Sequence, residues 1–118
     1  GESTTSLSLQ GSGNGAVQVD SKLVLGNDTI GSNGALNLNN PVTIIAKTSA
    51  GAYTLANGTQ TGEIKYITNT QNHNAVITPA NLSGYSTITL GLNDSVMLMY
   101  LATGTTWVII NNQDATLA

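Results

Sequence analysis

The chain has 118 residues, a formal net charge of -3 and only 8% charged residues, with three Lys plus Arg against six Asp plus Glu. Nucleic-acid binding draws most of its affinity from clustered Lys and Arg, so this composition excludes a nucleic-acid partner. The absence of Cys excludes disulfides and thiolate metal sites, and no apolar run approaches the ~20 residues that span a bilayer, so we expect a chain that is not membrane-embedded.

Residues 1–40 carry short pairs of apolar residues between turn-forming stretches rich in Gly, Asn and Ser. Gly and Asn tolerate positive φ and therefore favour turns. Each pair supplies too few inward side chains to bury a core alone, so such repeats become stable only by stacking on neighbours or on other chains. We predict a shaft-like β-repeat segment over residues 1–40, with a flexible linker as the alternative. The pairs are Leu7 and Leu9, Val17 and Val19, Leu23 and Leu25, and Leu36 and Leu38.

From residue 41 onward, apolar and polar residues alternate with period two, which predicts strands rather than helices. Pro41 lies where a strand can begin without a backbone N–H. The fold class that we expect is all-β, with the shaft-like segment followed by a small antiparallel β-sandwich head over residues 41–118. The predicted strands are residues 42–47, 52–55, 63–69, 75–78, 86–90, 95–101 and 107–110.

The last two predicted strands are apolar on both faces. Val96, Leu98 and Tyr100 share one face of the first strand, and Met97, Met99 and Leu101 share the other. A strand of this kind lies in the centre of a sandwich or between a sheet and another subunit. We expect the two strands to pair as a hairpin at the centre of the head. The residues that we assign to the core or subunit interface are Met97, Met99, Leu101, Trp107 and Ile109.

Residues 42–112 resemble the small C-terminal domains at the ends of phage tail fibres and other trimeric viral or phage-derived fibres, and residues 1–40 resemble the shaft that precedes such heads. The resemblance implies a parallel homotrimer on a virion surface or in an extracellular or cell-surface fibre. It also implies attachment to a cell-surface receptor, a glycan or a protein, and no catalytic residues or cofactors. The motifs, in chain order, are Tyr53-Thr54-Leu55-Ala56-Asn57-Gly58-Thr59, Gly62-Glu63-Ile64-Lys65-Tyr66-Ile67, Ile77-Thr78-Pro79-Ala80-Asn81-Leu82, Ile88-Thr89-Leu90, Asp94-Ser95-Val96-Met97-Leu98-Met99-Tyr100 and Trp107-Val108-Ile109.

Receptor-binding candidates are aromatic or amide side chains in loops. Tyr53 and Tyr85 lie near turns, and the loop over residues 70–74 is the richest in amides. The alternative for both tyrosines is packing at strand ends with the hydroxyl in water. The candidate residues are Tyr53, Asn72, His73, Asn74 and Tyr85.

Catalytic and metal sites find little support in the sequence. A glycosidase needs two carboxylates that flank the scissile bond, whereas solubility explains Glu63 and turn chemistry explains Asp94. The single His73 has no second ligand near it in the sequence, although three copies on a trimer axis would supply three imidazoles. We therefore predict no enzyme and no metal. A purely structural module for fibre assembly or capsid decoration, and a glycan-cleaving enzyme, are the alternatives to the receptor-binding fibre tip.

Overall fold

The computed structural model describes residues 7–118, so residues 1–6 of the predicted shaft-like segment lie outside the described residues. Every regular element of this part of the chain is a strand, which confirms the all-β prediction. Within the same residues no helix is long and apolar enough to cross a membrane. The strands are β1 (Asn27–Ile30), β2 (Gly34–Ala35), β3 (Val42–Ile45), β4 (Gly51–Leu55), β5 (Ile64–Asn69), β6 (Ala75–Pro79), β7 (Ile88–Leu90), β8 (Ser95–Leu101), β9 (Thr106–Gln113) and β10 (Thr116–Leu117).

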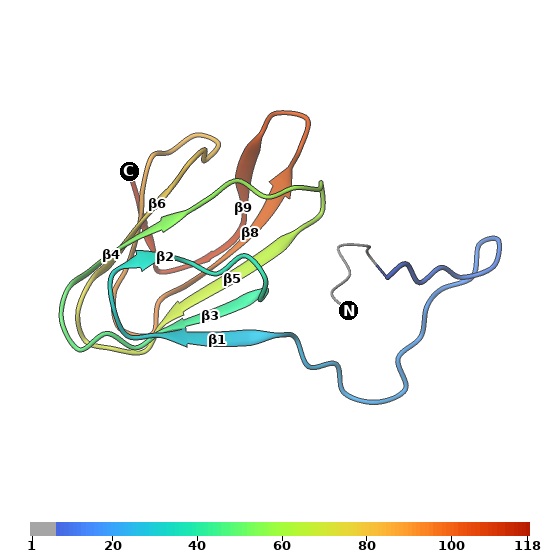
Figure 1. Ribbon diagram of the computed structural model, residues 1–118, viewed down its shortest axis with the longest axis horizontal. Coiled ribbons are helices and arrows are strands. Elements are labelled where there is room, and N and C mark those ends of the chain that lie inside the picture. Colours follow the sequence, from blue (N-terminus) through green and yellow to red (C-terminus); the bar gives the residue numbers. More distant parts are fainter. Residues whose placement is uncertain (1–6) are drawn as a thin grey trace, which may run out of the picture.

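The strands form two facing sheets, with the core between them (Figure 1). Sheet A has the strand order β1-β3-β5-β8-β9, and sheet B has the order β10-β7-β6-β4-β2. Alternation along each strand directs every second side chain into the space between the sheets. The buried apolar residues are Leu36, Ile45, Tyr53, Leu55, Ile67, Ala75, Ile77, Ile88, Leu90, Val96, Leu98, Tyr100 and Trp107.

The pairing within each sheet is mixed, so the expectation of an antiparallel sandwich is wrong. In sheet A, β1 pairs with β3 and β3 with β5, all in parallel; in sheet B, β2, β4 and β6 are also parallel. The chain crosses from sheet A to sheet B and back between successive strands of one sheet, so those strands run in the same direction. The first six strands therefore make three stacked coils, and β7 to β10 close the unit with antiparallel pairs.

The predicted hairpin of the last two long strands is present, because β8 and β9 pair antiparallel. It lies at one side of sheet A rather than at its centre, since β9 is an edge strand. The two faces of β8 divide as predicted: Val96, Leu98 and Tyr100 are buried, whereas Met97, Met99 and Leu101 are half-buried on the outer face.

Sheet A begins at Asn27 and sheet B at Gly34, both before residue 41, where we placed the start of the head. Residues 27–35 are hydrogen-bonded into both sheets through β1 and β2. Residues 7–26 form no strand and extend away from the sheets (Figure 1). The apolar side chains of this segment face water, with Leu7 85% exposed and Leu23 72% exposed.

Candidate functional site

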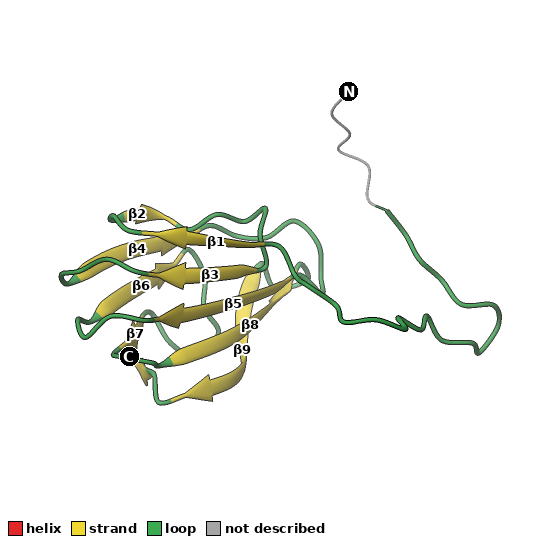
Figure 2. Ribbon diagram, turned by 90° about the horizontal axis from the view of Figure 1, so that it is seen from below, coloured by secondary structure: helices red, strands yellow, loops and turns green. Residues whose placement is uncertain are grey.

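The outer face of sheet A is apolar. Along β3, β5, β8 and β9, most side chains that alternate with core residues are aliphatic, Met or Tyr, and none is charged. The polar exceptions, Thr68, Ser95 and Thr106, lie at or near the ends of their strands. Figure 2 shows the strands of this sheet side by side in the view from below, with no other segment of the described chain running across them. We call this surface the apolar face. It comprises Val42, Ile44, Ile64, Tyr66, Met97, Met99, Leu101, Val108 and Ile110.

The outer face of sheet B has a different character, because Thr and Ala occupy most of its positions. The Thr hydroxyl groups at these positions can exchange hydrogen bonds with water, whereas on the apolar face only Tyr66 has a hydroxyl group. The outer face of sheet B therefore suits contact with water, and the outer face of sheet A suits contact with another apolar surface. The outward residues of sheet B are Ala35, Ala52, Thr54, Val76, Thr78, Thr89 and Thr116.

The residues predicted for the core or subunit interface are divided between the two sides of sheet A. Met97, Met99 and Leu101 lie on the apolar face. Trp107 points inward and is 1% exposed, with its ring 5.2 Å from that of Tyr100, and Ile109 packs against the same core. The Trp107 indole N–H donates to Ala56 O at 2.9 Å, which satisfies its one polar group.

Four connections gather at one end of the strands, which we call the loop end. Residues 31–33, 46–50 and 70–74 each join a strand of sheet A to the next strand of sheet B, and residues 91–94 join β7 to β8. Residues 7–26 enter at the opposite end, because they precede the first residue of β1, whereas residues 31–33 follow its last residue. The loop end therefore faces away from the N-terminal segment.

Asn69, the last residue of β5, organises the loop end and is only 1% exposed. Its Nδ2 donates to His73 O at 2.7 Å and to Leu90 O at 2.9 Å, and its Oδ1 accepts from Gln71 N at 3.0 Å. A buried amide with all of these partners holds loop 70–74 against the end of β7. Asn69 shares the inward alternation of Ile67, but its polar side chain gives no signal in the sequence that it is buried.

The structure separates the predicted receptor-binding residues into three environments. Asn72, His73 and Asn74 are exposed together in loop 70–74 of the loop end. Tyr85 is 46% exposed, but it precedes β7, whose Ile88 pairs with Ile77 late in β6, so it lies at the opposite end.

Tyr53 requires a correction, because its side chain is only 2% exposed and offers no surface to a receptor. Its hydroxyl has no hydrogen-bond partner, so the alternative of a hydroxyl in water is wrong as well. Burial raises the pKa of this phenol above its ordinary 10.0. Tyr53 is thus a core residue with an unpaired polar group.

Lys65 is a buried cation, 1% exposed, that the sequence pattern did not indicate. Its Nζ donates to Asn37 O at 2.6 Å, Asn40 O at 2.8 Å and Thr43 Oγ1 at 2.7 Å. Burial lowers the pKa of Lys65 below its ordinary 10.5, and the charge of Asp28 opposes part of that shift. These hydrogen bonds hold residues 37–40, which connect β2 to β3, against sheet A.

The two carboxylates considered for catalysis both hold loops in place. Glu63 Oε1 accepts from Thr59 N at 2.8 Å, Thr59 Oγ1 at 2.6 Å and Gln60 N at 2.9 Å. Burial by itself raises the pKa of Glu63, but these hydrogen bonds outweigh it, so the pKa lies below the ordinary 4.5. Asp94 Oδ2 accepts from Gly91 N at 2.7 Å. Among residues 7–118, no group of three or more His, Cys, Asp or Glu is placed to hold a metal ion.

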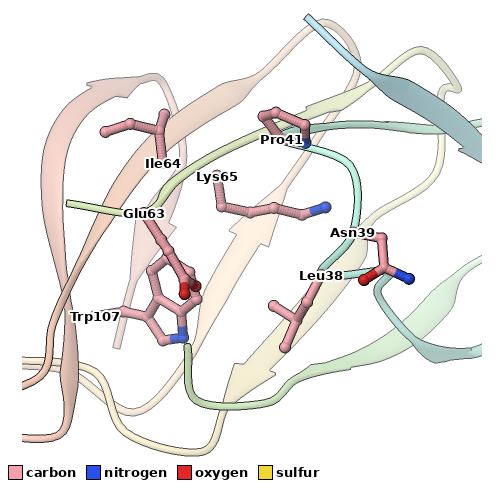
Figure 3. Close-up of a pocket in the computed structure, with 7 residues that line it drawn as sticks. All are labelled: Leu38, Asn39, Pro41, Glu63, Ile64, Lys65 and Trp107. Carbon is pink, nitrogen blue, oxygen red and sulfur yellow. The ribbon is translucent and has the colours of Figure 1, made fainter. Parts of the chain in front are cut away.

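A pocket of about 240 Å³ lies at the end opposite the loop end (Figure 3). The figure shows Glu63 and Trp107 on one side and Leu38 and Asn39 on the other. The strongest polar groups in its lining already have protein partners: Lys65 Nζ, Glu63 Oε1 and Trp107 Nε1. Lys65 Nζ and Trp107 Nε1 are therefore engaged within the protein rather than free for a ligand.

Comparisons with known proteins give a likeness of fold. No protein-family model matches the chain, and no curated protein matches it. A solved structure described as a chaperone–substrate complex is similar to this chain, with a TM-score of 0.51 and 22% sequence identity. The match covers 71% of this chain and 16% of that chain. At this identity the likeness concerns the fold alone.

Two surfaces therefore remain for a biological role. The apolar face can bury hydrocarbon against another protein surface, and the loop end can offer amide and hydroxyl groups to a polar ligand.

Proposed function

We propose that the chain forms the tip of a homotrimeric fibre that attaches to a cell-surface glycan or protein. The observation that carries this proposal is the apolar face, which nothing in the described chain covers although the opposite outer face is rich in Thr. Contiguous exposed apolar surface of this kind marks protein–protein contact. The environment that suits such a fibre is a virion surface or an extracellular or cell-surface location.

A second copy of this chain is the partner that best fits the apolar face. The centres of protein interfaces are depleted of charged residues and enriched in aromatic residues and Met, and the face has Tyr66, Met97 and Met99 with no charge. Most oligomers of soluble proteins are symmetric assemblies of identical chains. The number three comes from the resemblance of residues 42–112 to the ends of trimeric fibres.

The direction of the chain supports receptor contact at the loop end. The N-terminal segment enters at the opposite end, so a fibre that continues along that segment presents loops 31–33, 46–50, 70–74 and 91–94 outward. Asn72, His73 and Asn74 are exposed there on a loop that Asn69 holds in place. A fixed polar loop loses little conformational entropy when a ligand binds.

Light scattering of the purified chain tests the assembly. One chain has a mass of 12.1 kDa, so a trimer has a mass of 3 × 12.1, or about 36 kDa. A charge in a desolvated apolar contact is costly, so we expect Met99→Glu to give a folded monomer, with the circular dichroism spectrum of the wild type. Thr54→Glu, on the outer face of sheet B, is the matched control and keeps the trimer. A monomeric wild type would overturn the proposal.

Glycan arrays and whole-cell binding test the receptor role. We expect the wild-type trimer to bind, and Asn72→Ala or Asn74→Ala to weaken binding without changing the mass of the assembly. Ser83→Ala, in the exposed loop between β6 and β7, is the control. A trimer that binds neither glycans nor cells would support the purely structural module instead.

A further inference from the structure

A sequence repeat links the N-terminal segment to the first coil. Residues 11–19 read Gly-Ser-Gly-Asn-Gly-Ala-Val-Gln-Val, and residues 31–38 read Gly-Ser-Asn-Gly-Ala-Leu-Asn-Leu, with one extra Gly in the first copy. From the Asn onward the two copies keep a constant offset of 19 residues, which places Asn14 on Asn33 (33 − 14 = 19) and Val17 on Leu36 (36 − 17 = 19). The second copy contains β2 and the buried Leu36.

The same offset of 19 residues relates the paired residues of β2 and β4 in sheet B. Gly34 of β2 pairs in parallel with Tyr53 of β4, and 53 − 34 = 19. Asn33 Oδ1 accepts a hydrogen bond of 3.0 Å from Ala52 N, and 52 − 33 = 19. A segment that lies 19 residues before β2 and has the same sequence pattern thus matches the register of the next coil.

A further coil can add to the chain at the outer edge of β2. β2 is the last strand of sheet B, so its outer edge has no partner strand in residues 7–118. Val17 and Val19 are 51% and 56% exposed in a segment that forms no strand and extends away from this edge (Figure 1). Unpaired strand edges are the usual template for strand addition.

We propose that residues 14–19 of a second copy add to the free edge of β2 as a parallel strand. In this register Asn14 Oδ1 accepts from the Asn33 N–H, as Asn33 Oδ1 accepts from Ala52 N. Val17 lies beside Leu36, and Val19 lies beside Leu38, which is 39% exposed without such a partner. The inference rests on the proposed oligomer and names one contact within it.

Two features favour a second copy over the same chain. In the single chain the segment extends away from its own β2 edge. The proposed oligomer supplies neighbouring copies, and an extended segment that rises about 3.3 Å per residue can span a distance between copies.

Cysteine cross-linking tests the exchange, because the chain has no native Cys. Ala16 and Ala35 are exposed and become direct parallel neighbours at the 19-residue offset (35 − 16 = 19), within the Cα separation that a disulfide accepts. Ala16→Cys in a tagged chain is co-assembled with Ala35→Cys in an untagged chain and then oxidised. We expect a disulfide-linked dimer of one tagged and one untagged chain on a non-reducing gel. Ala50→Cys, an exposed Ala at the loop end, replaces Ala35→Cys in the control and gives no dimer above background.

Each other outcome contradicts the exchange. A disulfide within one chain of the Ala16→Cys/Ala35→Cys double variant, with no mixed dimer, shows that the segment docks on its own β2. The absence of both products shows that the segment does not dock there. Light scattering of the single variants separates this failure from failure of the assembly: a trimer without cross-links overturns only the exchange, whereas a monomer overturns both proposals.

Discussion

Lys65 Nζ donates a hydrogen bond of 2.7 Å to Thr43 Oγ1 in the interior between the two sheets. The Thr43 hydroxyl in turn donates to Asp28 Oδ1 at 2.9 Å. The three residues lie on β5, β3 and β1, so one polar chain of contacts crosses all three parallel strands of sheet A. Threonine suits the middle position because its hydroxyl both accepts and donates. The stacking of the coils therefore depends on polar contacts as well as on hydrocarbon burial.

Replacing Lys65 by Met should destabilise the fold by about 3 kcal/mol, because Thr43 Oγ1 loses a donor in a buried site and Asn37 O and Asn40 O lose one in part-buried sites. Urea denaturation followed by circular dichroism measures the change. Lys22→Met removes the same charge from an exposed position and should leave the midpoint unchanged. Equal urea midpoints for the two variants would show that the buried network contributes nothing to the free energy of unfolding.

Removing the Tyr53 hydroxyl should stabilise the protein. An unpaired buried hydroxyl costs about 1 to 3 kcal/mol, and Tyr53→Phe keeps the ring while it deletes that group. Thermal unfolding should show a higher midpoint for Tyr53→Phe and no change for Tyr85→Phe, whose ring is 46% exposed. A lower midpoint for Tyr53→Phe would mean that the hydroxyl has a partner in solution.

Gly58 lies against the ring of Tyr100. A Cβ on Gly58 would lie 2.7 Å from Tyr100 Cγ and 2.8 Å from Cδ2, closer than carbon atoms pack. Gly58→Ala should therefore cost about 1 to 3 kcal/mol, in the range of overpacked cores. Gly104→Ala is the control, since its Cβ would lie 3.4 Å from Thr106 Cγ2. Comparable unfolding free energies for the two variants would contradict the close packing.

Glu63 should contribute stability that acid removes. Its pKa is below the ordinary 4.5 in the folded chain, so in the window between the two values the unfolded chain holds more protons. The contribution is present above pH 4.5 and is lost as the pH falls through the folded pKa. Urea midpoints of the wild type and Glu63→Gln should differ most near neutral pH and converge in acid. A difference in urea midpoint that stays constant down to pH 3 would show that the ionisation of Glu63 does not contribute to stability.

The strand pattern could be predicted from the sequence because alternation depends only on which side chains face inward. The division of Val96, Leu98 and Tyr100 from Met97 and Met99 is a case where the structure agrees with the prediction. Pairing direction could not be obtained in this way, since a strand of period two has the same pattern in parallel and antiparallel sheets. The crossings between the sheets, which set that direction, are too irregular in length to read from composition.

The burial of polar residues in the interior could not be predicted from the sequence either. Lys65 and Asn69 occupy inward positions of β5, where a sequence pattern suggests apolar residues, and several of their partners, such as Asn37 O and Leu90 O, are far away along the chain. Tyr53 was misplaced because a ring near a turn fits both a loop and a core. Asn72, His73 and Asn74 could be assigned to an exposed loop from their composition, whereas the distance between that loop and Tyr85 depends on the coil arrangement.

The parallel stacking of the coils has an evolutionary consequence. A whole turn of chain can be inserted or deleted on the β1 and β2 side, and each remaining strand keeps the neighbour and direction that it had. The antiparallel closure and loops 46–50, 70–74 and 91–94 are untouched by such a change, because of the loop-end connections only loop 31–33 belongs to the first turn. Length and recognition can thus diverge independently, one through the number of turns and the other through a few polar side chains.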